Sequence, residues 1–405
     1  MVLDRRDFPP DNRVEQEARH LIAQGHEVVL VCERGPGRPE RELYQGIRVF
    51  RLAPLPRGLH KLQKILFPLS FVDFRWLVAL RRLGREHACE VFHVHDLPMA
   101  RTALRAARPL ACRVVLDFHE NFPVALQDFR SHSPKRVDAL ARRYYCNLSR
   151  WRAYERRVAR QADRIVVVVE ESRRRISALG VPDEKITVVS NTLHERFTAD
   201  PATLEEVASR FAGFFVLSYI GSLAHYRRVD TAIRAMPAIL SRVPRALLLV
   251  VGRVDERPDL QALAAEVGVK QRVAFVGWQP FDRVPAYVAA SDVGVLPHVP
   301  NDHTNSTVPH KLFHYMFLER PVIVSECVPL ARIVSECGCG RVVEGLATHP
   351  ARLAAAVVAS FENPGERAEM GRRGRQAVLE RYLWSREADR LASMYAGLGR
   401  EVATG

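Results

Sequence analysis

Short apolar runs alternate with amphipathic stretches along most of the chain. In the first half the apolar runs lie at residues 2–4, 26–33, 47–53, 91–96, 113–120 and 163–170. The alternation starts again in the second half, with runs at 214–223, 246–256, 272–278, 292–298 and 321–324. Strands that alternate with helices are typical of a parallel, doubly wound sheet. The pattern therefore predicts an α/β protein with two such sheets.

The length supports two domains, because 405 residues exceed what one ordinary hydrophobic core organises. We expect a first domain at 1–200, a second at 210–384, and a final helix at 385–405 that crosses back to the first domain. The chain begins directly at its first expected strand, so a few residues are expected upstream of Met1.

The net charge is the unusual feature of the composition. The formal charge of +14 implies attraction to an anionic partner, which could be nucleic acid, an anionic membrane surface or a phosphorylated substrate. No run reaches transmembrane length, and the amino terminus lacks the regions of a signal peptide. The seven cysteines are scattered, which favours a reducing, cytoplasmic compartment without structural disulfides or zinc.

Two strand ends in the first half carry polar residues. His95 and Asp96 close one strand, and His119 and Glu120 close the next. Ligands of doubly wound sheets bind beyond the carboxyl ends of the strands. Because side chains alternate along a strand, His93 and His95 are expected on the same face. Packing histidines are the alternative at each single strand end, and a metal site is the weaker alternative because no helical His pair or Cys cluster supports it.

Strand ends in the second half carry glycines and bases instead. Gly221 and Ser222 follow one strand, Gly252 follows the next, and Arg227 and Arg228 precede a helix. Glycine permits close backbone approach, and arginine pairs with phosphate oxygens in a forked geometry. One glycine turn is weak evidence, but its repetition favours a nucleotide site between the domains.

The stretch 305–340 has two successive loop-to-helix entries beside one strand end. We expect Ser306 and Thr307 to cap the first helix, Lys311 to lie in its first turn, and Leu330 to lie near the start of the second. Helix starts expose unpaired N–H groups and the positive end of the dipole, so this stretch predicts an anion pocket. An ordinary αβα unit with a surface lysine is the alternative.

A basic, aromatic stretch occupies residues 57–85. Its bases are Arg57, Lys61, Lys64, Arg75, Arg81 and Arg82, and its large apolar residues are Leu66, Phe67, Phe71, Phe74 and Trp76. This composition suits an anionic membrane interface around Trp76. A domain helix that packs its apolar side inward is the alternative.

These pieces together resemble the retaining glycosyltransferases of family 4. The resemblance rests on the order and spacing of HVHDLP, DFHE, ADRIVVVVEES, KITVVSNTL, YIGSLAHYRR, LLLVVGR, RVAFVGW, ASDVGVLPH, PHKLFHYM and RPVIVSECVPLARIVSECGCG. It implies the GT-B fold, which has two facing Rossmann-like domains with an interdomain cleft. It also implies transfer of a sugar from a nucleotide diphosphate sugar, with the donor on the second domain and the acceptor on the first.

The resemblance implies roles for individual residues. His95 matches the histidine that touches the donor sugar, and His119 is a weaker match. The diphosphate is held by Arg227 or Arg228, with Lys311 as a second base. The donor-binding residues are then Gly221, Ser222, Arg227, Arg228, Gly252, Ser306, Thr307, Lys311, His314 and Leu330. On the acceptor side we place Arg13, Asp96 and Glu120.

One departure from the family pattern concerns its two glutamates, which have seven residues between them. His314 stands at the second position and Ser306 at the first. A histidine can hydrogen-bond a ribose hydroxyl, so donor binding is compatible with this change.

The sequence therefore predicts a hexosyltransferase without cofactor or metal. We expect a lipid-linked or saccharide acceptor for cell-envelope or extracellular polysaccharide, a cytoplasmic location at the inner face of the membrane, and no nucleic-acid partner. A catalytically degenerate sugar-nucleotide-binding protein and, less favoured, a nucleic-acid-binding protein are the alternatives.

Overall fold

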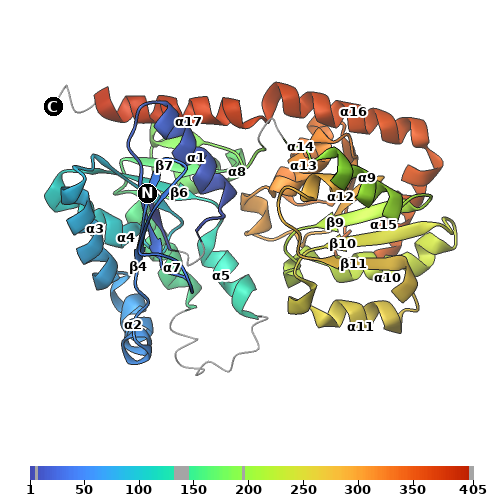
Figure 1. Ribbon diagram of the computed structural model, residues 1–405, viewed down its shortest axis with the longest axis horizontal. Coiled ribbons are helices and arrows are strands. Elements are labelled where there is room, and N and C mark those ends of the chain that lie inside the picture. The colour runs from blue at the N-terminus through green and yellow to red at the C-terminus, as the bar shows by residue number, and fades with distance from the viewer. Residues whose placement is uncertain (5–7, 132–145, 194–196, 401–405) are drawn as a thin grey trace. The chain divides into compact units, whose positions relative to one another are not determined.

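The computed structural model describes residues 1–4, 8–131, 146–193 and 197–400. The chain divides into two compact units. Unit 1 comprises Met1–Ser190 and Glu387–Gly405, and unit 2 comprises Asn191–Arg386. Each unit has its own sheet of mainly parallel strands, covered by helices (Figure 1).

The sheet of unit 1 has the strand order β3-β4-β2-β1-β5-β6-β7-β8. Its strands are β1 (Val2–Leu3), β2 (Val29–Glu33), β3 (Arg41–Tyr44), β4 (Ile47–Leu52), β5 (Val91–His95), β6 (Arg113–Phe118), β7 (Arg164–Val167) and β8 (Ile186–Val188). Only β3 runs antiparallel among the described strands. The longer helices are α1 (Asn12–Ala23), α2 (Arg57–Ser70), α3 (Phe74–Glu86), α4 (Ala100–Ala107), α5 (Phe122–Ser131), α7 (Leu148–Ala159), α8 (Glu170–Ser177) and, reaching unit 1 from Glu387 onward, α17 (Trp384–Arg400).

The sheet of unit 2 is parallel throughout its described strands, in the order β11-β10-β9-β12-β13-β14. Its strands are β9 (Phe215–Ile220), β10 (Ala246–Val251), β11 (Val273–Gly277), β12 (Val293–Leu296), β13 (Val322–Ser325) and β14 (Gly340–Val343). Its helices are α9 (Pro201–Arg210), α10 (Val229–Leu240), α11 (Pro258–Glu266), α12 (Val284–Ala289), α13 (His310–Phe317), α14 (Val328–Cys337), α15 (Pro350–Glu362) and α16 (Pro364–Arg381). The strand order reverses between β9 and β12, which marks the usual ligand position in this class of sheet.

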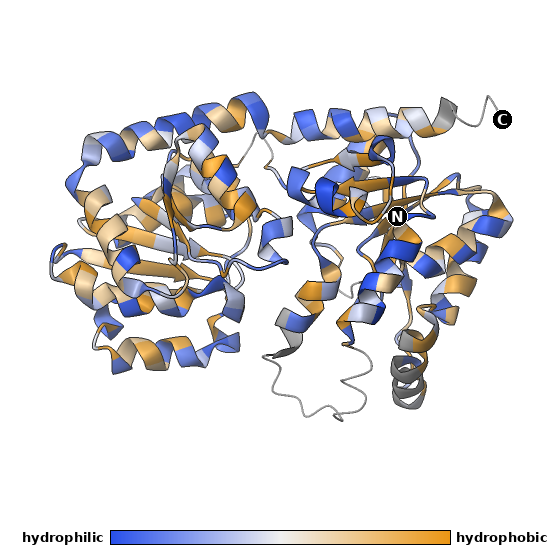
Figure 2. Ribbon diagram, turned by 180° about the vertical axis from the view of Figure 1, so that it is seen from behind, coloured by the Kyte–Doolittle hydropathy of each residue, from blue (hydrophilic) through white to orange (hydrophobic). Residues whose placement is uncertain are grey.

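Burial explains why the strands read as apolar runs. β10 and β12 are buried along their whole length, as expected for strands with helices on both faces. Figure 2 shows hydrophobic strands inside each unit and hydrophilic residues along the outer helices. The predicted α/β class with two doubly wound sheets is confirmed.

Three strands and one helix break were not predicted from the sequence. β3, β8 and β14 were not predicted as strands; each lies at or next to a sheet edge and spans only three or four residues. The stretch 57–85 forms two helices, because Phe71 ends α2 in the left-handed conformation and the Asp73 carboxylate caps α3 by accepting a hydrogen bond from the Trp76 amide.

Trp76 itself does not contribute to the membrane surface predicted for the region around it, and the membrane contact of that region stays a prediction. The Trp76 side chain is 0% exposed and lies in the core of unit 1. Among the described side chains of this region, the exposed large apolar ones are Leu59, Leu66, Leu69, Phe74 and Val78. The side chains of Arg57, Lys61 and Lys64 lie outside the described part of the structure.

Candidate active site

The histidines of unit 1 meet because β5 and β6 pair in parallel. His95 lies opposite Asp117 in the register of the two strands. The rings of His93 and His95 stack with their centroids 4.6 Å apart, which confirms that they share a face. The ring of His119 lies beside His95, with 3.4 Å between His119 Nε2 and His95 Nδ1.

Asp117 is the hub of these side chains. One of its carboxylate oxygens lies 3.1 Å from His95 Nδ1 and 2.6 Å from His119 Nε2. Arg13 donates to both carboxylate oxygens of Asp117, at 2.9 and 3.1 Å. Asp117 and His95 are buried and His119 is largely buried, so these contacts act at low dielectric.

The two site histidines have opposite protonation preferences. Burial, followed by the effect of neighbouring His93, holds the pKa of His95 well below its usual range. Burial also disfavours the charged form of His119, but Asp117 and Asp96 outweigh it and raise the pKa of His119 to about 9. His95 is therefore neutral at pH 7, with a buried Nε2 that has no hydrogen-bond partner among the described residues.

Three further residues complete what we call the histidine network. Glu17 pairs with Arg13 at 3.0 Å and lies 3.4 Å from His93 Nε2. The Tyr395 hydroxyl of α17 lies 2.7 Å from His93 Nδ1. The network is thus Arg13, Glu17, His93, His95, Asp117, His119 and Tyr395.

Four members of the network have the chemistry of metal ligands. Ligand atoms of Glu17, His93, His95 and Asp117 lie within 4.8 Å of one another. The guanidinium of Arg13 is already paired with both carboxylates, so a metal ion would have to displace a buried cation. The residues present therefore fit an arginine-centred network better than a metal ion.

The three residues placed on the acceptor side have different surroundings. Arg13 is buried, and its remaining terminal nitrogen donates to the Val189 carbonyl, so it acts inside unit 1 and not on an acceptor surface. Asp96 directly follows β5 with a positive φ of 66° and lies 3.5 Å from His119 Nδ1. Glu120 is half-buried just before α5.

In unit 2, three glycines stand side by side at successive strand ends. The Gly221 amide donates to the Val251 carbonyl, and the Gly252 amide donates to the Gly277 carbonyl. A Cβ at Gly252 would lie 2.3 Å from the Gly221 carbonyl oxygen, so only glycine fits there. Ser222 accepts a hydrogen bond at its carbonyl from the Tyr219 hydroxyl, which fixes the turn after β9.

Lys311 extends from the first turn of α13 over this glycine surface. Its Nζ lies 3.6 Å from the centroid of the Tyr219 ring and would lie 3.1 Å from a Cβ at Gly221. Nζ is buried and has no hydrogen-bond partner among the described residues. Burial and the charge of Arg227 hold the pKa of Lys311 well below its usual range.

Arg227 lies next to His298, which follows β12. The Arg227 Nη1 atom is 3.2 and 3.3 Å from the two ring nitrogens of His298, which places it over the ring face. Burial, followed by the charges of Arg227, Lys311 and His303, holds the pKa of His298 well below its usual range. We call Arg227, His298 and Lys311 the basic cluster.

Arg228 differs from its neighbour. Its guanidinium forms two hydrogen bonds with Asp230, at 3.0 and 2.8 Å, and its φ is 49°. The structure therefore brings Arg227, and not Arg228, together with Lys311. Neither His298 nor Tyr219 was predicted, although both stand at or just beyond predicted strand ends, which is the signal that could have identified them.

The start of α13 differs from the prediction. The helix begins at His310 after Pro309, without a side-chain cap. The Ser306 hydroxyl donates to the carbonyls of Asp302 and His303, and Thr307 is extended, so neither residue caps this helix.

The start of α14 is partly occupied. The Val328 amide donates to Asn305 Oδ1 at 2.9 Å, and Leu330 is buried in the first turn. Leu330 therefore lies near the start of α14, as predicted, whereas α13 begins three residues after Thr307.

His314 lies among aromatic rings. Its ring stacks on Phe197 with centroids 4.2 Å apart, and Phe281 packs edge-on at 5.9 Å. Burial, followed by the charges of His310 and Lys311, lowers the pKa of His314 to about 3. The side chain is thus neutral and packed, one helical turn from Lys311.

Comparison with known families fits this arrangement. Residues 10–192 match the family model of the glycosyl transferase 4-like domain, and residues 215–363 match that of glycosyl transferases group 1. The chain belongs to the glycosyltransferases. Within the described residues, no helix of this glycosyltransferase is long and apolar enough to cross a membrane.

Relatives and solved structures agree with the assignment. The glycosyltransferase is 26% identical, over 98% of both chains, to the GDP-mannose-dependent alpha-(1-6)-phosphatidylinositol monomannoside mannosyltransferase of Mycolicibacterium smegmatis. It is 29% identical to the 2-deoxystreptamine glucosyltransferase of Streptomyces kanamyceticus, over 65% of this chain and 67% of that one. Sucrose-phosphate synthase from Thermosynechococcus elongatus shares its GT-B fold, with a TM-score of 0.77 and 18% identity over 96% of this chain and 93% of that one.

Proposed function

We propose that this glycosyltransferase moves a hexose from a nucleotide diphosphate sugar to an acceptor with retention at the anomeric carbon and without a metal ion. The basic cluster is the observation that carries the proposal. The charges that act on Lys311 and His298 are all basic, and Lys311 Nζ is buried without a hydrogen-bond partner among the described residues. Buried charges are normally paired, so a site of this kind calls for an anionic ligand.

A diphosphate satisfies this cluster chemically. Cleavage of the anomeric bond leaves negative charge on the departing diphosphate, and in this proposal Lys311 and Arg227 stabilise that charge. The Gly221 and Gly252 turns allow the nucleotide close to the backbone. The mannosyltransferase relative is named for GDP-mannose, which supports a nucleotide sugar donor without fixing its base or sugar.

The stereochemical part of the proposal rests on unit 1. Retention through an enzyme nucleophile needs two carboxylates about 5 Å apart beside the scissile bond. Asp117 and Glu17 are both engaged by Arg13, so they are unsuited to that task. We therefore propose attack by the acceptor on the face that the diphosphate leaves, with the neutral His95 Nε2 hydrogen-bonded to the transferred sugar.

Nucleotide binding tests the proposal directly. Calorimetric titration with UDP, GDP and ADP should show one nucleoside diphosphate binding in the micromolar range, and Lys311→Met should weaken it at least tenfold. The matched control is Lys270→Met, an exposed lysine in the short turn at residues 270–272 that precedes β11. Absence of binding for all three nucleotides would refute the function, and binding without sugar transfer or donor hydrolysis would favour a binding protein.

For the acceptor we propose a lipid-linked saccharide at the cytoplasmic face of a membrane. Leu59, Leu66, Leu69 and Phe74 expose apolar surface on α2 and α3, and Phe74 is 62% exposed. The formal charge of +14 favours an anionic surface. The mannosyltransferase relative is named for a phosphatidylinositol acceptor, which supports this class.

Vesicle flotation tests the membrane part. The protein should float with vesicles that contain 30% anionic lipid and not with neutral ones, and Leu66→Ser with Leu69→Ser should abolish flotation. Leu379→Ser, at an exposed leucine of α16, is the matched control. Flotation that is unaffected by the double variant would place the contact elsewhere, and no flotation would favour a soluble acceptor.

A further inference from the structure

Two cysteines lie together at the carboxyl end of α14 in unit 2. Cys337 is the last residue of the helix, and Gly338 ends it in the left-handed conformation, with a φ of 57°. The Cys339 amide then donates to the Val334 carbonyl, which folds the chain back over the last turn. The Cα atoms of residues two apart are at most about 7 Å from each other, and a turn shortens this distance. The two cysteines are therefore within the range of a disulfide, roughly 4.4–6.8 Å between Cα atoms.

Hydrogen-bond donors surround the Cys337 sulfur. The Arg381 guanidinium donates to Cys337 Sγ at 3.3 Å, and the thiol of Cys339 hydrogen-bonds to the same sulfur. The hydrogen bond from Cys339, followed by the charge of Arg381, lowers the pKa of the Cys337 thiol, although burial opposes this. The same hydrogen bond, followed by burial, raises the pKa of Cys339. Cys337 is therefore the member of the pair that more readily becomes a thiolate, which is the nucleophilic form of the sulfur.

The two thiols also differ in their access from solvent. The side chain of Cys337 is 8% exposed, and that of Cys339 is 1% exposed. Arg381 is itself exposed, so the sulfur that it contacts lies just beneath the surface. A small oxidant therefore reaches Cys337 first, and Cys339 is in contact with the sulfur that has been oxidised.

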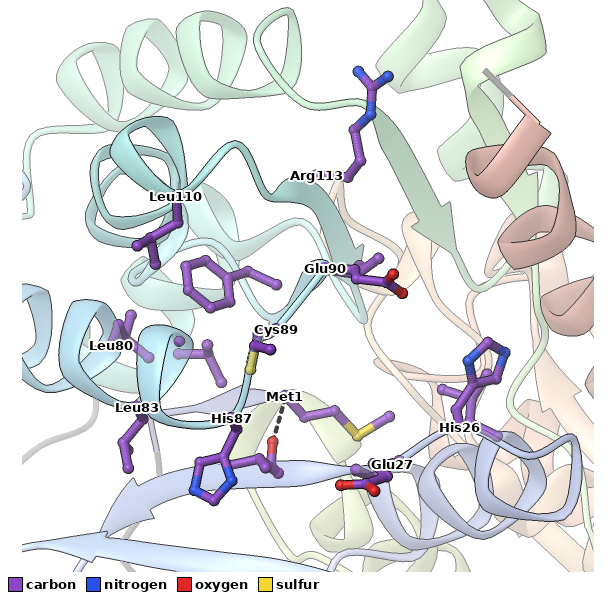
Figure 3. Close-up of a pocket in the computed structure, with 18 of the residues that line it drawn as sticks. Met1, His26, Glu27, Leu80, Leu83, His87, Cys89, Glu90, Leu110 and Arg113 are labelled. Carbon is purple, nitrogen blue, oxygen red and sulfur yellow. Dashed lines mark hydrogen bonds between the residues drawn. The ribbon is translucent and has the colours of Figure 1, made fainter. Parts of the chain in front are cut away.

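Cys89 and Cys112, in unit 1, have the opposite surroundings although both are more exposed than Cys337. Cys112 Sγ donates to the Cys89 carbonyl at 2.8 Å, a hydrogen bond that requires the protonated thiol. Figure 3 shows Cys89 beside Leu80 and Leu83 in a cavity of this unit. Burial raises the pKa of both thiols, that of Cys112 to about 11. Thiols in such surroundings are unreactive.

We propose that Cys337 and Cys339 form a redox site, in which a peroxide oxidises Cys337 beside Arg381 and Cys339 then closes a disulfide. The Cys337 sulfur attacks one oxygen of hydrogen peroxide: an S–O bond forms, the O–O bond breaks, and the departing hydroxide takes up the proton that Cys337 released. The Cys339 sulfur attacks the resulting sulfenic acid: an S–S bond forms, the S–O bond breaks, and the oxygen leaves as water with the Cys339 proton. Two thiols and one peroxide thus give a disulfide and two molecules of water. The proposal is independent of the proposed glycosyl transfer.

Peptide mass spectrometry of the native protein tests the site. Trypsin cleaves after Arg332 and Arg341, so one peptide, residues 333–341, contains both cysteines. The protein is treated with an equimolar amount of hydrogen peroxide, alkylated in denaturant and digested. This peptide should have lost two hydrogens and carry no alkyl group, and treatment with dithiothreitol before alkylation should restore both thiols. A peptide 333–341 that is fully alkylated after peroxide would overturn the proposal.

The same digest contains an internal control. Cys89 and Cys112 lie in the tryptic peptides 86–101 and 106–113. Access from solvent favours their oxidation, whereas the hydrogen bonds described above favour that of Cys337. Both control peptides should therefore be alkylated after the peroxide treatment. Oxidation of their thiols as fast as that of peptide 333–341 would overturn the proposal.

Arg381→Gln tests the contribution of the guanidinium. The change leaves both cysteines in place and removes the charged donor, so oxidation of peptide 333–341 should slow by about fivefold or more. Arg372→Gln, at an exposed arginine of α16, is the matched control and should keep the original rate. Equal rates in the two variants would overturn the assignment of Cys337 as a thiol that Arg381 activates.

Cys339→Ser separates the two steps. Serine keeps a hydrogen-bond donor beside Cys337, so the first oxidation should still occur. The sulfenic acid should then persist, and dimedone, which reacts with sulfenic acids, should label Cys337. The unmodified protein should show little labelling, because Cys339 consumes the sulfenic acid. Equal labelling of both proteins would overturn the role of Cys339.

Discussion

The histidine network of unit 1 and the basic cluster of unit 2 both have buried members, but only the network pairs its basic side chains with carboxylates. In unit 1, Arg13 and His119 surround Asp117, and each cation has a carboxylate within 3 Å. In unit 2, the charges that act on Lys311 and His298 are all basic. A balanced network holds its own members in place, whereas an unbalanced cluster awaits a ligand of opposite charge.

This difference indicates that the two units have different roles, one positioning a side chain and the other binding an anion. The network fixes the ring of His95 and keeps it neutral, so it positions one group without needing substrate. In the basic cluster, repulsion between neighbouring basic groups destabilises the free protein, and a bound anion would relieve this repulsion. Substitutions should therefore change stability in opposite directions in the two units.

The largest effect is expected for Asp117→Asn. Removing the carboxylate leaves Arg13 buried without its main partner, which costs roughly 3–5 kcal/mol when a buried pair is broken. Denaturant unfolding should show this loss, together with loss of transfer because His95 is no longer held. Asp96→Asn is the matched control: Asp96 is partly exposed and asparagine tolerates its positive φ, so a small effect is expected. Equal free energies of unfolding for the two variants would show that the buried pairs of Asp117 do not stabilise unit 1.

Lys311→Met should have the opposite sign. Removing a buried cation that lacks a counter-charge should leave the melting temperature of the free protein unchanged or raised. The stabilisation by saturating nucleoside diphosphate should disappear, because hydrogen bonds to charged groups contribute about 1.5–3 kcal/mol. Thermal unfolding with and without nucleotide measures both effects. Destabilisation of the free protein would mean that Lys311 is a structural residue.

The pH dependence should separate the units as well. His119 keeps its proton in the folded state up to about pH 9, against an ordinary pKa of 6.5, so its contribution is complete below pH 6.5 and is lost as the pH rises through 9. The pKa of Glu17, raised to about 8 chiefly by burial and then by Asp117, acts in the same direction. The lowered pKa of Lys311 acts oppositely, since the unfolded chain binds the proton more strongly and stability rises with pH.

Hydrogen exchange of individual strands measures these opposite slopes. Between pH 7 and pH 9, after correction for intrinsic exchange, β6 should lose protection by on the order of 2 kcal/mol. Protection of β9 should hold or increase over the same range. His119→Gln should flatten the slope of β6 alone. Parallel slopes in both units would contradict the contrast in charge balance.

The sequence allowed correct predictions for residues that lie at the carboxyl ends of strands. Periodicity located both sheets, and strand alternation placed His93 and His95 on one face. The glycine turns and Lys311 were found because a parallel sheet brings its strand ends to one edge. These inferences depend on local pattern and on topology, which one sequence contains.

Other features depend on contacts that the sequence does not show. The sequence around Trp76 is typical of a membrane interface, but the helix break at Phe71 directs the Trp76 side chain into the core. The sequence places Arg13 in a loop after the first strand, but its guanidinium forms hydrogen bonds with Asp117, which is 104 residues away in the chain. His314 has the spacing of a ligand-binding residue, but it packs on Phe197 from a distant segment. Long-range pairing of this kind cannot be derived from spacing.

The smallest effect is expected for Arg228→Asn, which bears on the choice between two adjacent arginines. Asparagine tolerates the φ of 49°, so the change removes the guanidinium without straining the turn. Because Arg228 is already paired with Asp230 and partly exposed, nucleotide affinity should change by less than about threefold. Arg227→Ala should weaken it tenfold or more, since Arg227 lies in the basic cluster. Titration of both variants with the same nucleoside diphosphate decides the matter. Equal losses of nucleotide affinity in the two variants would mean that the ion pair between Arg228 and Asp230 opens when the donor binds. Arg228, which Asp230 neutralises in the free protein, would then act on the nucleotide together with the basic cluster.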